Sequence, residues 1–273
     1  MDQNTAPEPQ KALREQQYEG TVPGALTLGG GLLCLLLRLY LNAHCFDAQG
    51  LLHRGCLLHG ALVALSVGVL AGLFFLCRGM GSDCRFRRNY RPSTAAGILL
   101  FLAVPCFLAY GILNLGGESD VFTRLTAMLS LFMVPVLIWL GLSRLEGRPC
   151  AFLFPLGGCL FLIVRLICRF RHWSTDPVIE DYASALLSNV MAMLAAFHTT
   201  GFSLGQGARR RSLFFCLAAI FFSLLSLADG MEALPFSLGV ILWMLGALPR
   251  MKKPQARRRP GGQILPETPE ETE

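Results

Sequence analysis

Residues 30–39 read GGLLCLLLRL, and residues 157–166 read GGCLFLIVRL. Six of the ten positions are identical at a constant offset of 127 residues, and they include Arg38 and Arg165. Arginine is rare inside apolar segments, because a charged group is costly to place in a nonpolar medium. The two stretches therefore predict related helices in the two halves of the chain, in a fold that surrounds both with apolar material.

The composition of the whole chain predicts that lipid is its solvent. Of 273 residues, 53% are hydrophobic and only 15% are charged, and the mean hydropathy is +0.50. Soluble domains carry about 25% charged residues. The net charge of +6 does not indicate a nucleic-acid partner, because the basic residues form short clusters between apolar runs. Such clusters are typical of the loops of membrane proteins, so the predicted partner is the lipid bilayer.

Eight apolar runs are long enough, or nearly long enough, to form membrane-spanning helices. A span needs about 20 mostly apolar residues, and the last two runs are short. The predicted fold class is an all-α polytopic transmembrane helix bundle. The runs are 22–44, 56–77, 94–116, 123–143, 149–170, 182–205, 211–228 and 233–249.

The distribution of basic residues predicts the orientation. Eighteen of the 24 Lys and Arg residues lie in the two tails and in the loops after the second, fourth and sixth runs. Cytoplasmic loops carry an excess of Lys and Arg, so both termini are predicted to be cytoplasmic. That arrangement requires an even number of spans, which eight satisfies, and it predicts a multi-pass protein of the cell (cytoplasmic) membrane.

The offset similarity predicts an internal duplication of four plus four helices. Four spans are an even number, so both halves enter the membrane in the same direction, and the repeat is parallel rather than inverted. The predicted division is a cytoplasmic N-terminal tail (1–21), a first four-helix repeat (22–145), a second (149–250) and a disordered cytoplasmic C-terminal tail (251–273). The C-terminal tail is rich in Pro, Gly and charge and has no apolar periodicity.

Arg38 and Arg165 are the first candidate site. They could face each other across the pseudo-twofold axis and bind a small anion, an anionic lipid head group, or the loop acids Glu118 and Glu232. The alternative is that each arginine extends to the membrane surface and anchors its helix there. The two interpretations differ in whether the side chains point into the bundle or out to lipid.

A second candidate is the polar outer stretch WSTDPVIEDY, residues 173–182. Its aromatic and acidic residues could form a surface for a ligand or partner, or could simply anchor the helix ends at the membrane interface. The candidate residues are Trp173, Asp176, Glu180, Asp181 and Tyr182.

No metal, cofactor or catalytic site is predicted. His53, Cys56 and His59 are acceptable zinc ligands, but their spacing matches no established motif. Whether Cys45 and Cys56 form a disulfide stays open. His198 is a candidate for packing or, alternatively, for proton transfer. The chain has no HExxH, GxSxG or P-loop sequence.

Several stretches resemble a family of multi-pass membrane proteins from anaerobic Gram-positive bacteria. They are FDAQGLLHRG (46–55), RHWSTDPVIEDYASALL (171–187) and AAFHTTGFSLGQGARRRSLFFCLAAIFFSLLSLADG (195–230). The resemblance implies a bacterial inner-membrane location. The family has no known activity, so the resemblance implies no functional residue.

Three classes of function remain in competition. The first is a transporter-like or small-ligand or lipid-binding bundle, and the second is a non-transporting scaffold, sensor or envelope-assembly partner. The third, a lipid-modifying membrane enzyme, lacks any motif. A polar cavity that reaches the middle of the bundle would favour the first class, and a closed apolar middle would favour the second.

Overall fold

The computed structural model describes residues 8–44, 57–80, 84–116, 121–173, 179–230 and 233–249. For residues 8–20, 88, 172–173 and 179–182 it describes the backbone alone. The described part of the chain is all-helical. This confirms the predicted fold class at the level of a helix bundle.

Seven span-length helices, the shorter helix α9 and two helices of four residues make up the described structure. The elements are α1 (Glu8–His44), α2 (Leu57–Arg78), α3 (Phe86–Asn89), α4 (Thr94–Leu115), α5 (Val121–Glu146), α6 (Leu153–Trp173), α7 (Ile179–Ser203), α8 (Arg209–Leu225), η1 (Ser226–Asp229) and α9 (Leu234–Ala247).

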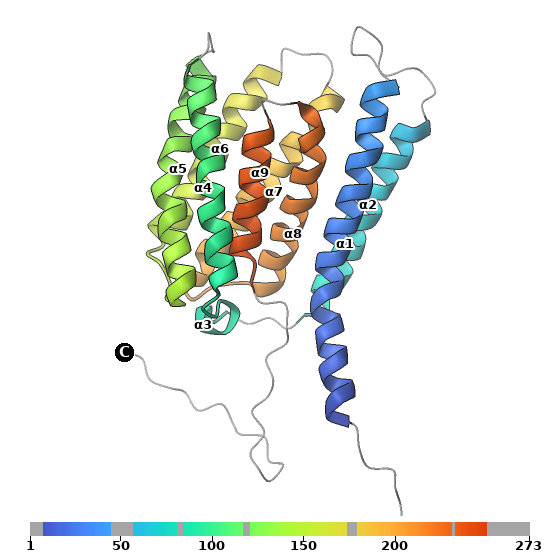
Figure 1. Cartoon of the computed structure of the whole chain (residues 1–273), viewed down its shortest axis with the longest axis vertical. Helices are drawn as coiled ribbons and strands as arrows, with labels where there is room; N and C mark the ends of the chain where they lie inside the picture. Colours follow the sequence, from blue (N-terminus) through green and yellow to red (C-terminus); the bar gives the residue numbers. More distant parts are fainter. Residues whose placement is uncertain are drawn as a thin grey trace, which may run out of the picture.

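Seven of these helices are long and apolar enough to cross a membrane. The eighth apolar helix, α9, has only 14 residues, or about 21 Å of helix, against about 30 Å of bilayer hydrocarbon. In Figure 1, α9 nevertheless lies among the longer helices and runs alongside them. The membrane, multi-pass character predicted from sequence is therefore supported by seven helices, with a shorter eighth packed among them.

Most predicted helix ends lie within a few residues of the observed ends. The exception is α1, which begins at Glu8 rather than at residue 22 and continues through Pro23. Proline removes one backbone donor from a helix. The hydroxyl of Thr27, one turn later, donates to the carbonyl oxygen of Pro23 itself at 2.8 Å. The short helix α3 was not predicted, because four residues are too few to show an apolar period.

The helices surround α8 and α9 (Figure 1). The α4–α5 pair lies on one side, α6 and α7 lie behind, and the α1–α2 hairpin lies on the other side against α8. Burial reflects this order. In the most apolar segment of each helix, 72% of the residues are buried in α8 but only 22% in α2. The start of α1 and the end of α9 lie at the same end of the bundle.

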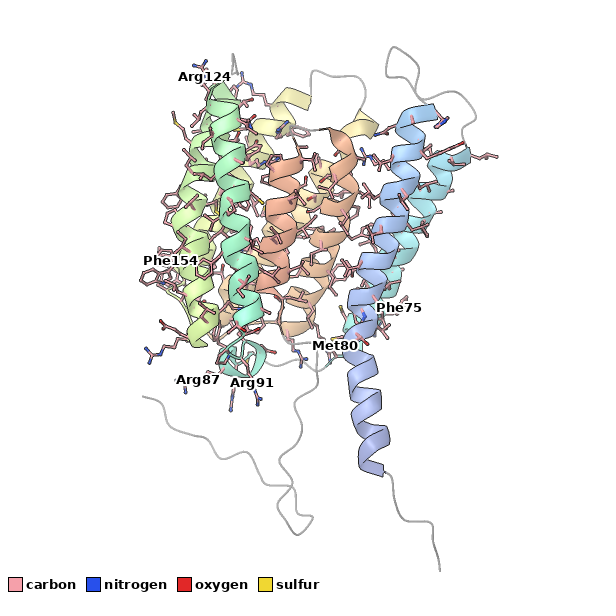
Figure 2. The ribbon with its side chains drawn as sticks, viewed as in Figure 1. Phe75, Met80, Arg87, Arg91, Arg124 and Phe154 are labelled. Atoms are coloured by element: carbon pink, nitrogen blue, oxygen red, sulfur yellow. The ribbon has the colours of Figure 1, made fainter. Side chains whose placement is uncertain are left out.

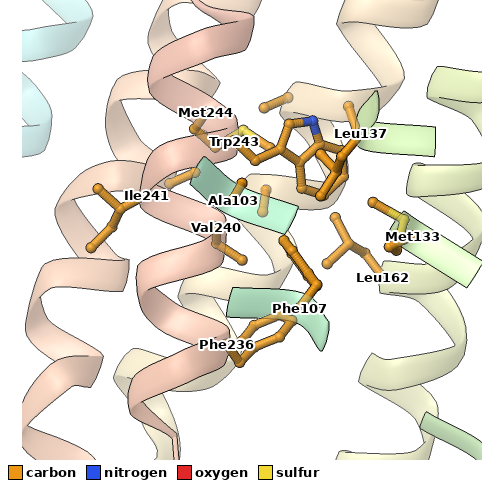
Figure 3. Packing of buried hydrophobic residues seen from close by; sticks show 14 of the residues in the cluster. Ala103, Phe107, Met133, Leu137, Leu162, Phe236, Val240, Ile241, Trp243 and Met244 are labelled. Atoms are coloured by element: carbon orange, nitrogen blue, oxygen red, sulfur yellow. The ribbon is translucent and has the colours of Figure 1, made fainter. Parts of the chain in front are cut away.

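Two apolar clusters hold the helices together. The larger cluster contains residues of every long helix from α4 through α9. It includes Phe107, Met133 and Trp243, whose side chains pack in the middle of the bundle (Figure 3). The smaller joins α1 and α2 to α8 and includes Leu73 and Phe221. Both clusters use α8, so this helix is the shared wall between the hairpin and the rest of the bundle.

The helix contacts do not follow a division into two sets of four. The α1–α2 hairpin packs on α8, which belongs to the second predicted repeat. Helices α7 and α8 pack closely, whereas their counterparts under the duplication, α2 and α4, share no comparable contact between described residues. The parallel repeat, with its boundaries at 22–145 and 149–250, stays a prediction.

Close packing of α9 against α4 depends on a glycine. A methyl group on Gly246 would lie 2.6 Å from Leu100 Cγ and 3.0 Å from the carbonyl oxygen of Ala96. The same group on Gly68 of α2 would meet nothing within 4 Å. Small residues let helix backbones approach each other in membranes, so the two glycines should differ sharply in their tolerance of alanine.

We expect Gly246→Ala to lower the free energy of unfolding of the detergent-solubilised protein by about 1–3 kcal/mol, the usual cost of overpacking. Gly68→Ala is the matched control and should leave stability unchanged or raise it by up to about 1 kcal/mol, because alanine favours helix. Denaturant unfolding followed by circular dichroism measures both. Equal effects of the two substitutions would contradict the close approach of α9 to α4.

Candidate functional site

The first polar cluster ties α1 to the end of η1. A guanidinium nitrogen of Arg38 lies 2.7 Å from Asp229 Oδ1, and both side chains are 11% exposed. The hydroxyl of Ser184 donates to Asp229 Oδ2 at 3.1 Å. The amide of Asn42, one turn beyond Arg38, donates to the carbonyl oxygen of Ala228 at 3.1 Å. These contacts clasp the α1–α2 hairpin to the rest of the bundle.

The second polar cluster surrounds Arg165 on α6, which is only 4% exposed. Its Nη1 donates to Asn189 Oδ1 at 3.2 Å, and Asn189 in turn donates to the carbonyl oxygen of Leu162 at 2.9 Å. The guanidinium lies 3.3 Å from the ring centroid of Phe236 and 5.6 Å from that of Tyr110. Two aromatic faces and one amide therefore stabilise this buried cation.

The described surroundings of Arg165 contain no negative charge. Its Nε has no hydrogen-bond partner among the described residues. The Tyr110 hydroxyl lies close by, together with Thr126 and a second cation, Arg169. A buried guanidinium normally has a carboxylate or another anion beside it, because desolvation of an unpaired charge is costly. Within the described part of the chain, this site has a cation in excess.

Serine pairs continue the polar contacts between α7, α8, η1 and α9. The hydroxyls of Ser188 and Ser223 are 2.7 Å apart, and those of Ser226 and Ser237 are 2.8 Å apart. Ser226 also donates to the carbonyl oxygen of Ser223 at 3.0 Å. Such interhelical bonds are a common way to join helices in lipid, and these hold together the half of the bundle that contains Arg38 and Arg165.

The structure separates the two arginines that the sequence paired. Both point into the bundle, but Arg38 is neutralised by Asp229, whereas Arg165 contacts Asn189 and two aromatic rings. A shared anion site across a twofold axis stays a prediction, and the described contacts of the two arginines differ. Asp229 and Asn189 were missed because their sequence context reads as an ordinary turn and an ordinary polar position on a helix.

Other candidate residues lie outside the described part of the chain. The structure does not describe Glu118, Glu232, Asp176, Cys45, His53 or Cys56. Nor does it describe the side chains of Trp173, Glu180, Asp181 and Tyr182. The acidic contacts, the outer-loop surface, the disulfide and the zinc alternative all stay predictions.

His198 takes a packing position. Its ring stacks on Phe215 with centroids 5.2 Å apart and an interplanar angle of 6°. Among the described residues, no group of three or more His, Cys, Asp and Glu is placed to hold a metal ion.

A third arginine, Arg144 on α5, caps the short helix α9 at the opposite end of the bundle. Its Nε donates to the carbonyl oxygen of Gly246 and its Nη2 to that of Leu248, both at 2.9 Å. The guanidinium also lies 4.4 Å from the ring centroid of Tyr90. The last carbonyls of a helix lack partners within the helix. A cation near them also interacts favourably with the negative end of the helix dipole. In the sequence, Arg144 is one of the basic residues of the loop after the fourth apolar run, which predicts orientation alone.

The groups around Arg144 are held in neutral form. Burial raises the pKa of the Tyr90 phenol well above its usual range, and burial also raises the pKa of the Cys150 thiol. A small cavity of about 40 Å³ lies between Tyr90, Arg144, Cys150 and Trp243. It has room for a few water molecules at most. A thiol reacts as the thiolate, so Cys150 is poorly suited to act as a nucleophile.

Comparisons with protein-family models, with curated proteins and with solved structures find no match for this chain. The functional argument therefore rests on the geometry of the polar clusters.

The clasp between Arg38 and Asp229 makes a thermodynamic prediction. Asp229→Asn should lower the free energy of unfolding by on the order of 3 kcal/mol, because it leaves the guanidinium of Arg38 without its carboxylate in a largely buried site. Arg38→Gln combined with Asp229→Asn should cost clearly less than the sum of the two single substitutions. Unfolding of the purified wild-type, single and double variants measures the coupling. Strictly additive effects would show that the pair contributes no interaction energy.

Proposed function

We propose that this chain is an integral membrane protein that binds an anionic group, carried by a lipid or by a small ligand, at Arg165. One observation carries the proposal: Arg165 is buried among neutral and cationic described neighbours, with one guanidinium nitrogen unpaired. A phosphate or carboxylate there would satisfy both the charge and the open donor. The Tyr110 hydroxyl lies beside Arg165 and would help to orient such a group.

The middle of the bundle argues against a continuous polar path through it. Phe107, Leu137, Val240 and Trp243 are each at most 2% exposed, and their side chains gather in one apolar cluster (Figure 3). This favours binding within one half of the membrane over free passage across it. The same closed middle supports a second candidate function, a non-transporting scaffold, sensor or envelope-assembly partner.

We further propose the cell membrane as the location, with both termini cytoplasmic. The start of α1 and the end of α9 lie at one end of the bundle, where Arg87 and Arg91 also lie (Figure 2). The loops that join α2 to α4, α5 to α6 and α7 to α8 bring further basic residues to this end. Cytoplasmic ends of membrane proteins carry such an excess. The resemblance to bacterial inner-membrane proteins suggests the same location.

The proposed orientation can be tested with cysteines on either side of α2. Cys84 is exposed beyond the end of α2, and Leu57, 89% exposed, begins it. In a background without the other native cysteines, a membrane-impermeant maleimide should label Leu57→Cys in intact bacterial cells. It should label Cys84 only after the cells are opened. The reverse pattern would invert the proposed topology, and labelling of both from outside would contradict a membrane crossing by α2.

Binding at Arg165 can be tested by ligand-induced stabilisation. Inorganic phosphate and the short-chain lipid dihexanoyl phosphatidic acid are the probes, with dihexanoyl phosphatidylcholine as the neutral-headgroup comparison. A bound ligand at a hundredfold excess over its Kd raises the free energy of unfolding by about 2.7 kcal/mol. We expect Arg165→Met to abolish the rise in Tm while the protein still folds, since an apolar side chain replaces a buried cation.

The matched control is Arg124→Met, because Arg124 lies on the end of α5 and points away from the bundle (Figure 2). It should bind the probes as the wild type does. A response to phosphatidic acid alone would assign the site to a lipid, and a response to inorganic phosphate would assign it to a small anion. The proposal fails if no probe gives a stabilisation that depends on Arg165. It also fails if Glu118→Gln or Glu232→Gln lowers the free energy of unfolding in wild type but not in Arg165→Met, because an acid of this chain would then neutralise Arg165.

A further inference from the structure

A groove of about 440 Å³ opens at the other end of the bundle, between the start of α4 and the end of α9. Its polar wall includes Arg91, Ser93 and Arg144, and its apolar wall includes Leu99 and Leu245. Ligand pockets in proteins are commonly about 300–1,000 Å³. The groove is therefore large enough for part of an organic ligand, unlike the small cavity on the other side of Arg144.

The two arginines of the groove differ in how they are held. Arg144 is buried, and the carbonyl oxygens of Gly246 and Leu248 fix two of its three guanidinium nitrogens. Arg91 is exposed and extends from the end of the bundle (Figure 2). A ligand in the groove would thus meet one fixed positive charge at its base and a second at its mouth.

The charge around the groove is mainly positive. Arg78, Arg85, Arg87 and Arg148 lie in or beside the loops at this end. Among the described side chains at the ends of α2 and α5 and in the loops that follow them, Glu146 is the one acid. Such a surface attracts anions from the membrane interface, at about 1 kcal/mol for each basic residue close to an anionic membrane.

We propose that this groove binds an anionic phospholipid of the bilayer. The phosphate of the head group would lie between Arg91 and Arg144, and an acyl chain would lie along Leu99, Leu245 and Leu248. The groove lies at the start of the span-length helix α4 and at the end of the shorter helix α9. Its cationic wall would therefore lie at the depth of the head groups, and its apolar wall would begin the hydrocarbon layer. A soluble anion would use the arginines but would leave the apolar wall without a contact.

Native mass spectrometry of the full-length protein in detergent tests the proposal with dioleoylphosphatidylglycerol and, as the net-neutral comparison, dioleoylphosphatidylcholine. The wild type should retain phosphatidylglycerol preferentially. Arg91→Gln should weaken its binding about fivefold without changing the binding of phosphatidylcholine. Ala95→Leu should weaken it similarly with no change of charge, because Ala95 lines the groove and leucine would fill part of it.

Arg148→Gln is the matched control, since Arg148 is exposed at the same end but does not line the groove. It should retain phosphatidylglycerol as the wild type does. Equal losses in Arg91→Gln and Arg148→Gln would overturn the proposal in favour of diffuse attraction to a basic surface. Displacement of the lipid by millimolar inorganic phosphate would overturn it in favour of a soluble anion.

Discussion

The ion pair between Arg38 and Asp229 ties α1 to η1, beside the apolar cluster through which the α1–α2 hairpin packs on α8. The hairpin packs mainly on α8 through one apolar cluster, and lipid tails are as apolar as leucine, so apolar contact alone gives little drive for association in a membrane. The clasp adds a directional contact, supported by Ser184 on α7 and by the bond from Asn42 to Ala228. Polar contacts therefore supplement the apolar clusters where α1 meets η1.

The same reasoning applies to the short helix α9. With 14 residues it is too short to cross the hydrocarbon layer alone, yet it occupies the centre of the bundle beside α8. Arg144 satisfies its last carbonyls, and Gly246 allows close contact with α4. A helix end inside a membrane needs such partners, because water is not available to supply them. Arg144 thus both completes α9 and forms the base of the groove beside it.

Cationic groups at the two ends of the bundle have different surroundings. Arg165 lies inside, beside aromatic rings and an amide, whereas Arg91 and Arg144 line a groove that opens at the interface. Between them lies the closed apolar middle of Phe107, Leu137 and Trp243. This arrangement agrees with the two proposed anion-binding sites, and it argues against a continuous path for a hydrophilic solute.

The apolar runs of the sequence predict lipid as the solvent of this protein, and they predict where most of its helices begin and end. A bilayer requires runs of about 20 apolar residues, and this requirement is local, so the runs were recognisable without knowledge of the fold. The sequence also singled out Arg38 and Arg165, because arginine stands out in an apolar run. It could not reveal that Arg38 pairs with Asp229 while Arg165 faces Asn189 and Phe236. Their similar sequence contexts suggested a common role. Only the tertiary structure decided these partners, since a side chain in a membrane bundle interacts with whichever helix packs beside it, and that neighbour is not encoded in the local apolar pattern.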